Sequence, residues 1–347
     1  MKSCDYNSRR CGVAVFIFSL TVLTLSGIFT GTSRAQQGDE DEDIVARARL
    51  FPDVGPGVRA IRRSAAGRYY ILTAPGAAIG IYTAEGQRIG QVPANPTKES
   101  AIVFGEDFDL DSSGRVYVAD RGADAVKVFS PEGTLAMKFP VAAPTSVASL
   151  SGGEIAVASL RANRLVEIVD AQGKKVRDFG DLSDLAERAS LNRFLNVGRL
   201  LSDSSANLYY AFTYLPEPTV RKYDRYGYAA MEVSLRALEY QPAAQAARRE
   251  IWRQDQRSGT PTFKPVINAF GVDPQSQEIW VALGDELLHF DREAIRHTSY
   301  RTYSVEGARV EPVAILVEPD RLILAADPLG IFNFARPGKA APTATLH

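Results

Sequence analysis

One pattern of short apolar segments and polar turns recurs along most of the chain, and it limits the possible folds more than any other feature. Its clearest copy spans residues 108–139, where the runs FDLD, VYVAD, VKVF and TLAMKF are separated by the turns SSGR, RGADA and SPEG. The turn glycines Gly114 and Gly133 are 19 residues apart, and Gly67 and Gly86 in the preceding copy have the same spacing. β-Branched and aromatic runs separated by such turns predict four short antiparallel strands per copy.

Six copies of this unit follow one another, most of them about 40 to 50 residues apart, which is a spacing typical of β-propeller blades. The strands are apolar at successive positions, as in residues 116–119 and 279–282, which indicates that both faces of each sheet are buried. Sheets stacked on sheets around an axis satisfy this condition. We therefore expect an all-β, six-bladed β-propeller over residues 44–337, a single domain rather than the two that 347 residues suggest.

The stretch DLDSSGRVYVADRGADAVKVFSPEG, residues 109–133, resembles an NHL repeat. The other copies match less well, since Ser159 stands at the position of the strand-end aspartate and Ala206 at that of the turn glycine. The resemblance covers most of residues 56–337 and implies a six-bladed propeller. NHL-like propellers include protein and RNA binders and a few lyases and hydrolases, so the resemblance implies a fold and not an activity.

The N-terminus has the pattern of an export signal. Basic residues precede an uncharged stretch over residues 11–29, and a sequence of small residues ending at Ala35 suits a signal peptidase. We expect a signal peptide over residues 1–35, an acidic disordered leader over 36–43 and a C-terminal tail over 338–347. The alternative is an uncleaved membrane anchor through residues 11–29, because this stretch is nearly long enough to cross a bilayer. Either way the propeller is exported, to the periplasm or the extracellular space.

Cleavage after Ala35 changes the charge and the cysteine content. Of the 40 basic and 41 acidic residues, residues 1–35 hold four and one, which leaves 36 and 40 and a net charge of −4. Both cysteines, Cys4 and Cys11, are removed, which excludes disulfides and cysteine-ligated metals from the mature chain. An exported protein with this charge is not expected to bind nucleic acid.

The sixth copy has only three strands, because its pattern ends at Phe334 and Ala335. Residues 44–51 are a candidate for the missing outer strand, which would join the two ends of the chain and cover an exposed sheet edge. The sequence IVARAR within this segment is equally compatible with a helix, so both alternatives stay open.

The geometry of a blade predicts which face carries function. In a four-stranded antiparallel blade, the loop between the second and third strands emerges on the same face as the connection to the next blade. The two largest insertions, residues 181–196 and 236–265, are both such connections, and both have helical periodicity. We expect ligand-binding residues on this face: Arg121, Arg161, Asn163, Tyr214, Arg249, Trp252 and Arg253.

The second insertion carries a cluster of arginines around Trp252. One interpretation is a basic lid over the mouth of the central channel. The other is a helix that covers apolar surface at one rim, with its arginines in solvent.

The residues limit the classes of enzyme. His289, His297 and His347 are the only histidines, and two of them fall in one copy, so a three-histidine metal site spread over several blades is excluded. A calcium-type site in the channel is conceivable from carboxylate and amide residues at strand ends, namely Glu106, Asn163, Asn268 and Asp327.

Aspartates recur at one position of the repeat. Asp111, Asp203 and Asp273 each end a first strand, and such repetition indicates a turn-forming role rather than a catalytic one.

Together these patterns predict an exported, monomeric, non-enzymatic propeller without cofactor that binds a peptide, protein or glycan on the face with the insertions. It would meet a membrane only through an uncleaved signal segment. The alternative function is a calcium-dependent hydrolase or lyase with its site in the channel.

Overall fold

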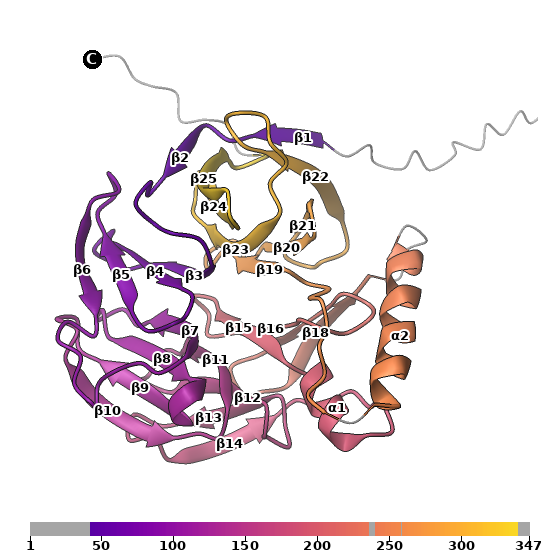
Figure 1. Cartoon of the computed structure of the whole chain (residues 1–347), viewed down its shortest axis with the longest axis horizontal. Coiled ribbons are helices and arrows are strands. Elements are labelled where there is room, and N and C mark those ends of the chain that lie inside the picture. Colours follow the sequence, from indigo (N-terminus) through magenta and orange to yellow (C-terminus); the bar gives the residue numbers. More distant parts are fainter. Residues whose placement is uncertain (1–41, 236–239, 258, 339–347) are drawn as a thin grey trace, which may run out of the picture. The chain divides into compact units, whose positions relative to one another are not determined.

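The computed structural model describes residues 42–235, 240–257 and 259–338. In this part of the chain, six sheets surround a central channel as a six-bladed β-propeller (Figure 1). The first strands of neighbouring blades contact one another all the way round the ring, so the first strand of each blade is the innermost. The expected fold class is therefore confirmed.

Each blade takes its strands in sequence order from the channel outward. The strands of blades one to three are β3 (Val58–Arg63), β4 (Tyr69–Thr73), β5 (Ile79–Tyr82), β6 (Arg88–Val92), β7 (Gly105–Leu110), β8 (Val116–Asp120), β9 (Ala125–Phe129), β10 (Leu135–Pro140), β11 (Pro144–Ser149), β12 (Ile155–Ser159), β13 (Val166–Val169) and β14 (Lys175–Phe179). Those of blades four to six are β15 (Gly198–Ser202), β16 (Leu208–Phe212), β17 (Thr219–Tyr223), β18 (Ala229–Ser234), β19 (Ala269–Val272), β20 (Ile279–Leu283), β21 (Glu286–Phe290), β22 (His297–Tyr303), β23 (Pro312–Val317), β24 (Arg321–Ala326) and β25 (Gly330–Ala335).

Apolar clusters fill the junctions between neighbouring blades. Within the described residues there is one such cluster at each of the six junctions, built from the facing sides of two sheets. The middle strands are buried on both faces, as in β8 and β16, where every residue is buried. Apolar burial at roughly 25 cal/mol per Å² is thus the main force that holds the blades together in the part of the chain described here.

The aspartates that end first strands form turns, as their repetition predicted. One carboxylate oxygen of Asp203 accepts hydrogen bonds from the backbone N–H groups of Ser205 (2.8 Å) and Asn207 (2.9 Å). Asp111 and Asp273 accept equivalent bonds in blades two and five.

Residues near the start of the described chain close the ring. β2 (Ala48–Leu50) pairs antiparallel with β25 and becomes the outer strand of blade six, as proposed from the sequence. β1 (Glu42–Val45) adds a parallel fifth strand to blade five beside β22. Glu42 and Asp43 are therefore in a strand, which corrects the expectation that the acidic leader extends to residue 43.

The first insertion is helical over a shorter range than its periodicity predicts. α1 spans Ala189–Leu195, and residues 181–188 are not helical. Side chains satisfy the backbone N–H groups of this segment: Asn196 accepts from Ser183, Asn192 accepts from Leu185 and Ala186, and Asp255 accepts from Glu187 and Arg188. These bonds replace the intrahelical bonds that a helix would supply.

The second insertion forms α2 (Gln241–Asp255), with Pro242 in its first turn as expected. Ile251 packs with Leu191 and Leu195 of α1, and Arg248 pairs with Glu217. In Figure 1, α2 stands at the edge of the ring and not over the channel. The lid interpretation is therefore wrong, and the rim interpretation describes the position of this helix.

The expected signal segment, most of the acidic leader and residues 339–347 of the tail lie outside the described residues. Among the residues that are described, no helix is both long and apolar enough to cross a membrane.

The closing segment predicts a first stability measurement. Phe51 follows β2, is buried, and packs its ring 5.2 Å from that of Tyr69 and 5.5 Å from that of Tyr82 in blade one. We expect Phe51→Ala to lower the free energy of unfolding in urea by about 3–5 kcal/mol, because it leaves a cavity at the junction of blades six and one. The control Val45→Ala, at an exposed position of β1, is expected to change it by less than about 0.5 kcal/mol. Equal effects of the two variants would show that this junction does not stabilise the ring.

A buried ion pair predicts a second effect. Arg336, at the end of β25, donates to Asp273 in blade five and to the backbone oxygen of Glu318 (3.0 Å). Burial raises the pKa of Asp273, but hydrogen bonds from Gln275, Ser276 and Arg336 outweigh it and hold the pKa well below the usual range. The contribution of Asp273 to stability is thus complete above its unfolded pKa of about 3.9 and is lost as pH falls below that value.

We expect Arg336→Met to lower the free energy of unfolding at pH 7 by about 3–5 kcal/mol, because a buried carboxylate loses its cation. The variant is also expected to lose less stability than the parent between pH 5 and pH 3. Arg253→Met, which breaks the exposed Arg253–Glu250 pair on α2, is the control and is expected to cost under about 1 kcal/mol. An unchanged acid dependence in Arg336→Met would contradict this account of Asp273.

Candidate functional site

The central channel narrows to a small cavity of about 30 Å³ between the first strands of the blades. Arg59 and Arg62 from β3, Asp107 from β7 and Arg199 from β15 extend into it. The channel is therefore filled by charged side chains and is not an open pore.

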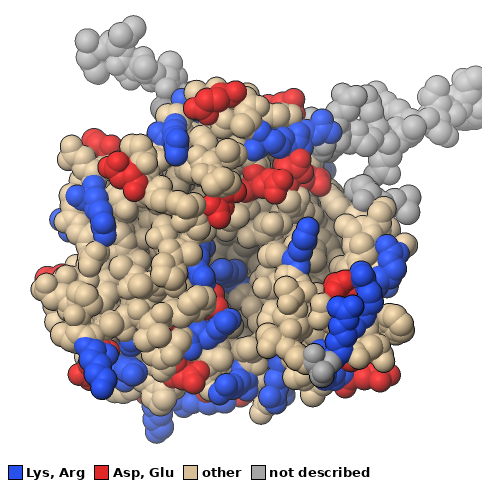
Figure 2. Space-filling view, viewed as in Figure 1, with Lys and Arg blue, Asp and Glu red and all other residues tan. Residues whose placement is uncertain are grey.

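A wider cavity of about 180 Å³ lies at one mouth of the channel. Its walls come from loops between second and third strands, including Arg121 and Tyr214, and from the connections that contain Phe194 and Pro265. These are the segments that blade geometry places on one face. Figure 2 shows a hollow in the middle of the molecule with Lys and Arg side chains gathered around it.

Glu106 holds two arginines together at this mouth. One carboxylate oxygen lies 2.8 Å from Nη1 of Arg59, and the other lies 2.7 Å from Nη1 of Arg121. Both guanidinium groups also lie over the ring of Phe104, at 4.4 and 5.3 Å from its centre. Arg199 donates to the backbone oxygen of Glu106 at 2.8 Å.

Two aspartates balance the arginines deeper in the channel. Asp107 lies 3.2 Å from Arg62 and 3.8 Å from Arg199, and Asp109 lies 3.4 Å from Arg62. Burial raises the pKa of Asp109, whereas Arg62 and the backbone N–H of Ser149 act in the opposite sense.

The charges of the channel and its mouth do not cancel. Four guanidinium groups face three carboxylates, and the raised pKa of Asp109 favours its neutral form. The region therefore has an excess of positive charge in a concave, partly buried setting, which attracts anions.

An aromatic wall completes the mouth. The ring of Tyr214 stacks on that of Phe194 at 5.0 Å, and Phe263 packs against Phe194 at 5.8 Å. Burial raises the pKa of Tyr214, so its phenol stays protonated at neutral pH and able to donate a hydrogen bond. The mouth thus combines cationic groups with a flat apolar surface.

The residues predicted from the sequence fall into separate places. Arg121 and Tyr214 line the mouth, whereas Arg161 and Asn163 are exposed in the corresponding loop of blade three, outside the lining of this cavity. Arg249 and Arg253 are exposed on α2.

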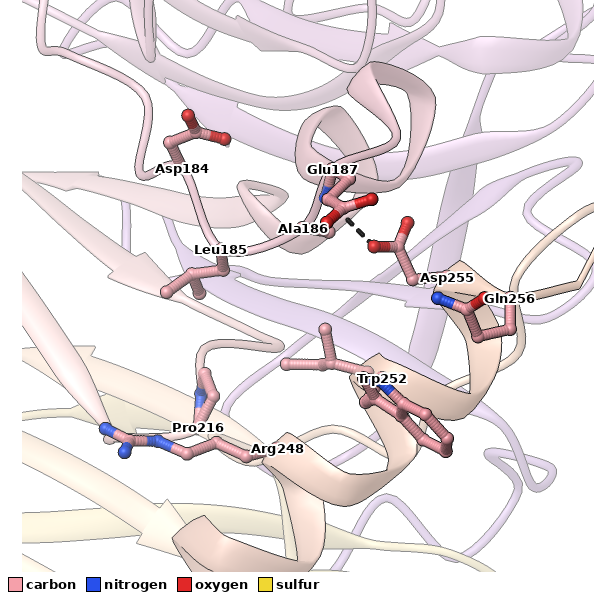
Figure 3. Close-up of a pocket in the computed structure, with 10 residues that line it drawn as sticks. Asp184, Leu185, Ala186, Glu187, Pro216, Arg248, Trp252, Asp255 and Gln256 are labelled. Atoms are coloured by element: carbon pink, nitrogen blue, oxygen red, sulfur yellow. Dashed lines mark hydrogen bonds between the residues drawn. The ribbon is translucent and has the colours of Figure 1, made fainter.

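Trp252 of α2 lines a different cavity, of about 600 Å³, between α2 and the segment before α1 (Figure 3). Its side chain is 67% exposed, and Leu185 lies on the other side of this cavity. In Figure 3 a hydrogen bond joins Glu187 to Asp255 across one end of the cavity. The α2 residues therefore belong to a rim groove and not to the channel.

The four residues of the calcium alternative do not form one site. Glu106 and Asn268 line the mouth, but Asn163 and Asp327 lie outside its lining. The carboxylate of Glu106 is engaged by two arginines, and the amide oxygen of Asn268 accepts from Gly284 at 2.9 Å. No group of three or more His, Cys, Asp or Glu side chains suited to a metal occurs among the described residues.

Sequence reasoning missed Arg59, Arg62 and Arg199, which lie in the innermost strands. β-Bulges near the start of β3 and β7 make Arg59 and Glu106 the extra, unpaired residues at equivalent positions of blades one and two. A bulge re-aims a side chain without a clear sequence signature, so strand alternation does not reveal this pair. The available signal was the presence of charged residues inside otherwise apolar first strands.

No protein-family model and no protein of curated function matches the chain. Among solved structures, the WD40 repeats of RRP9 are similar, with a TM-score of 0.55 and 10% identity over 85% of this chain and 99% of that one. A streptogramin B lyase has a TM-score of 0.53 and 12% identity over 84% of this chain and 87% of its own. At these identities the similarity shows the propeller fold alone.

Proposed function

We propose that this protein is an exported, non-enzymatic propeller that binds a peptide, protein or glycan through an anionic group at the channel mouth. The observation that carries the proposal is the excess of guanidinium groups around a concave cavity with an aromatic wall. Arginine is well suited to such recognition because its planar fork binds carboxylates and similar groups in a defined geometry.

The size of the cavity supports a macromolecular ligand. Pockets for whole small molecules usually measure about 300–1,000 Å³, and the mouth offers about 180 Å³. A cavity of this size suits one end group or side chain of a larger ligand whose remainder lies on the surrounding loops. Arg161 and Asn163, exposed in a loop of the same face, are placed to extend such a contact.

The state of the charged groups supports binding over catalysis. Glu106 and Asp107 are each paired with two arginines, and a paired carboxylate is a weak base. The phenol of Tyr214 is held in its neutral form. We therefore assign no catalytic residue, no cofactor and no nucleic-acid ligand, and we propose that the protein acts as a monomer, since one chain closes its own ring.

Removal of one mouth arginine tests the binding proposal. We expect Arg199→Ala to weaken binding of an acetylated, amidated glutamate-rich peptide, or of oligogalacturonate, by about tenfold or more, since a hydrogen bond to a charged group contributes about 1.5–3 kcal/mol. Calorimetry with a glutamine-rich peptide as the neutral probe checks that charge is required.

The matched control is Arg193→Ala, which removes an exposed arginine of α1 outside the cavity lining and is expected to leave affinity unchanged. Equal affinities of parent, Arg199→Ala and Arg193→Ala would place the ligand elsewhere.

Export is the second part of the proposal. We expect the protein recovered from the periplasm or the culture medium to begin at Gln36, as measured by intact mass, because signal peptidase cleavage after Ala35 removes residues 1–35. Recovery in the membrane fraction with these residues intact would support the anchor through residues 11–29 instead.

A further inference from the structure

The carboxylate of Glu106 occupies the position that an anionic ligand needs. Its two oxygens each pair with a different guanidinium, that of Arg59 and that of Arg121, and its side chain is 16% exposed at the cavity. A carboxylate from outside can form the same two contacts only where Glu106 gives them up.

We propose that Glu106 is an internal substitute for the ligand, and that the ligand presents a carboxylate which displaces it between Arg59 and Arg121. This inference rests on the proposed binding function and names its chemical class. The carboxylate belongs to an acidic side chain, a peptide C-terminus or a uronic acid, which share this group and differ in what surrounds it.

The two arginines do not depend on Glu106 alone for their positions. Both guanidinium groups lie over the ring of Phe104, a contact that persists when the carboxylate leaves. The third cation, Arg199, is held by the backbone oxygen of Glu106, which the departure of the side chain does not remove. The cationic frame therefore stays in place during the exchange.

The exchange is selective because it conserves ion pairs. A ligand carboxylate restores both contacts that Glu106 gives up, whereas a neutral end group leaves two guanidinium groups without an anion. Glu106 is the unpaired residue of the β7 bulge, so its side chain can turn away without breaking a ladder hydrogen bond at that residue. Internal competition also keeps the affinity for any single carboxylate modest.

A side-chain deletion with chemical rescue tests the proposal. In Glu106→Ala, we expect millimolar propionate, which replaces the missing side chain, to raise the melting temperature in a saturable manner, because a bound ligand stabilises the folded state. Propionamide, which has the same shape and no charge, should have no effect.

The control is Glu217→Ala, since Glu217 is a glutamate of the same face with similar exposure (19%) that pairs with Arg248 on α2. Propionate that stabilises Glu106→Ala no more than Glu217→Ala would overturn the inference. Glu106→Gln keeps the volume of the side chain and serves for the binding measurements if the alanine variant is poorly folded.

Affinity measurements separate this inference from the binding function. We expect Glu106→Gln to bind the acetylated glutamate-rich peptide about tenfold tighter than the parent, because no internal carboxylate competes. A neutral peptide with a free C-terminus and oligogalacturonate identify the source of the carboxylate. Peptide binding that Arg199→Ala weakens and Glu106→Gln leaves unchanged would overturn displacement and leave the binding function standing. Failure of the parent and of Glu106→Gln to bind any of the three probes would overturn both.

Discussion

Pairing of β2 with β25 closes the ring, and the geometry of the channel depends on that closure. Six wedge-shaped junctions fix the positions of the first strands only when the last junction, between blades six and one, is formed. Phe51 fills this junction from the segment that follows β2. The distance between Arg59 in blade one and its partner Glu106 in blade two is therefore set by contacts on the far side of the molecule, at the outer edge of blade six.

The channel shows how a small fold concentrates charge without losing stability. Its arginines come from strands whose other faces are buried in apolar clusters, so their positions are fixed by packing. Each is paired with carboxylates of β7, which avoids the large cost of an isolated buried charge. The residual positive charge is placed at the mouth, where Arg121 is close to half exposed and water lowers the cost further. A binding site arises where this compensation is incomplete.

The sequence predicts the scaffold well and the site poorly, for physical reasons. Blade number, turn aspartates and the closing strand follow from periodicity, because each repeat has to bury the same two faces. The pairing of Arg59 with Glu106 depends on two bulges, which shift the register by one residue and leave no distinct pattern. Residues 181–188 have helical periodicity but are extended, because Asn192 and Asp255 bond their backbone from outside the segment. The position of Trp252 at the rim follows from the packing of α2 on α1, which a single sequence does not specify.

The parallel and antiparallel strands at the start of the described chain also govern the order of folding. Ala48 pairs with Asn333, 285 positions later, so the first part of the propeller to be synthesised is paired only after the last blade exists. Contacts of this sequence separation form slowly, because the entropy of closing the loop is lost before any contact is gained. Until then, β22 and β25 each lack an outer neighbour and can pair with other chains. Blades one to four assemble from neighbouring segments, whereas completion of the ring is a single late event on which the protein's resistance to aggregation depends.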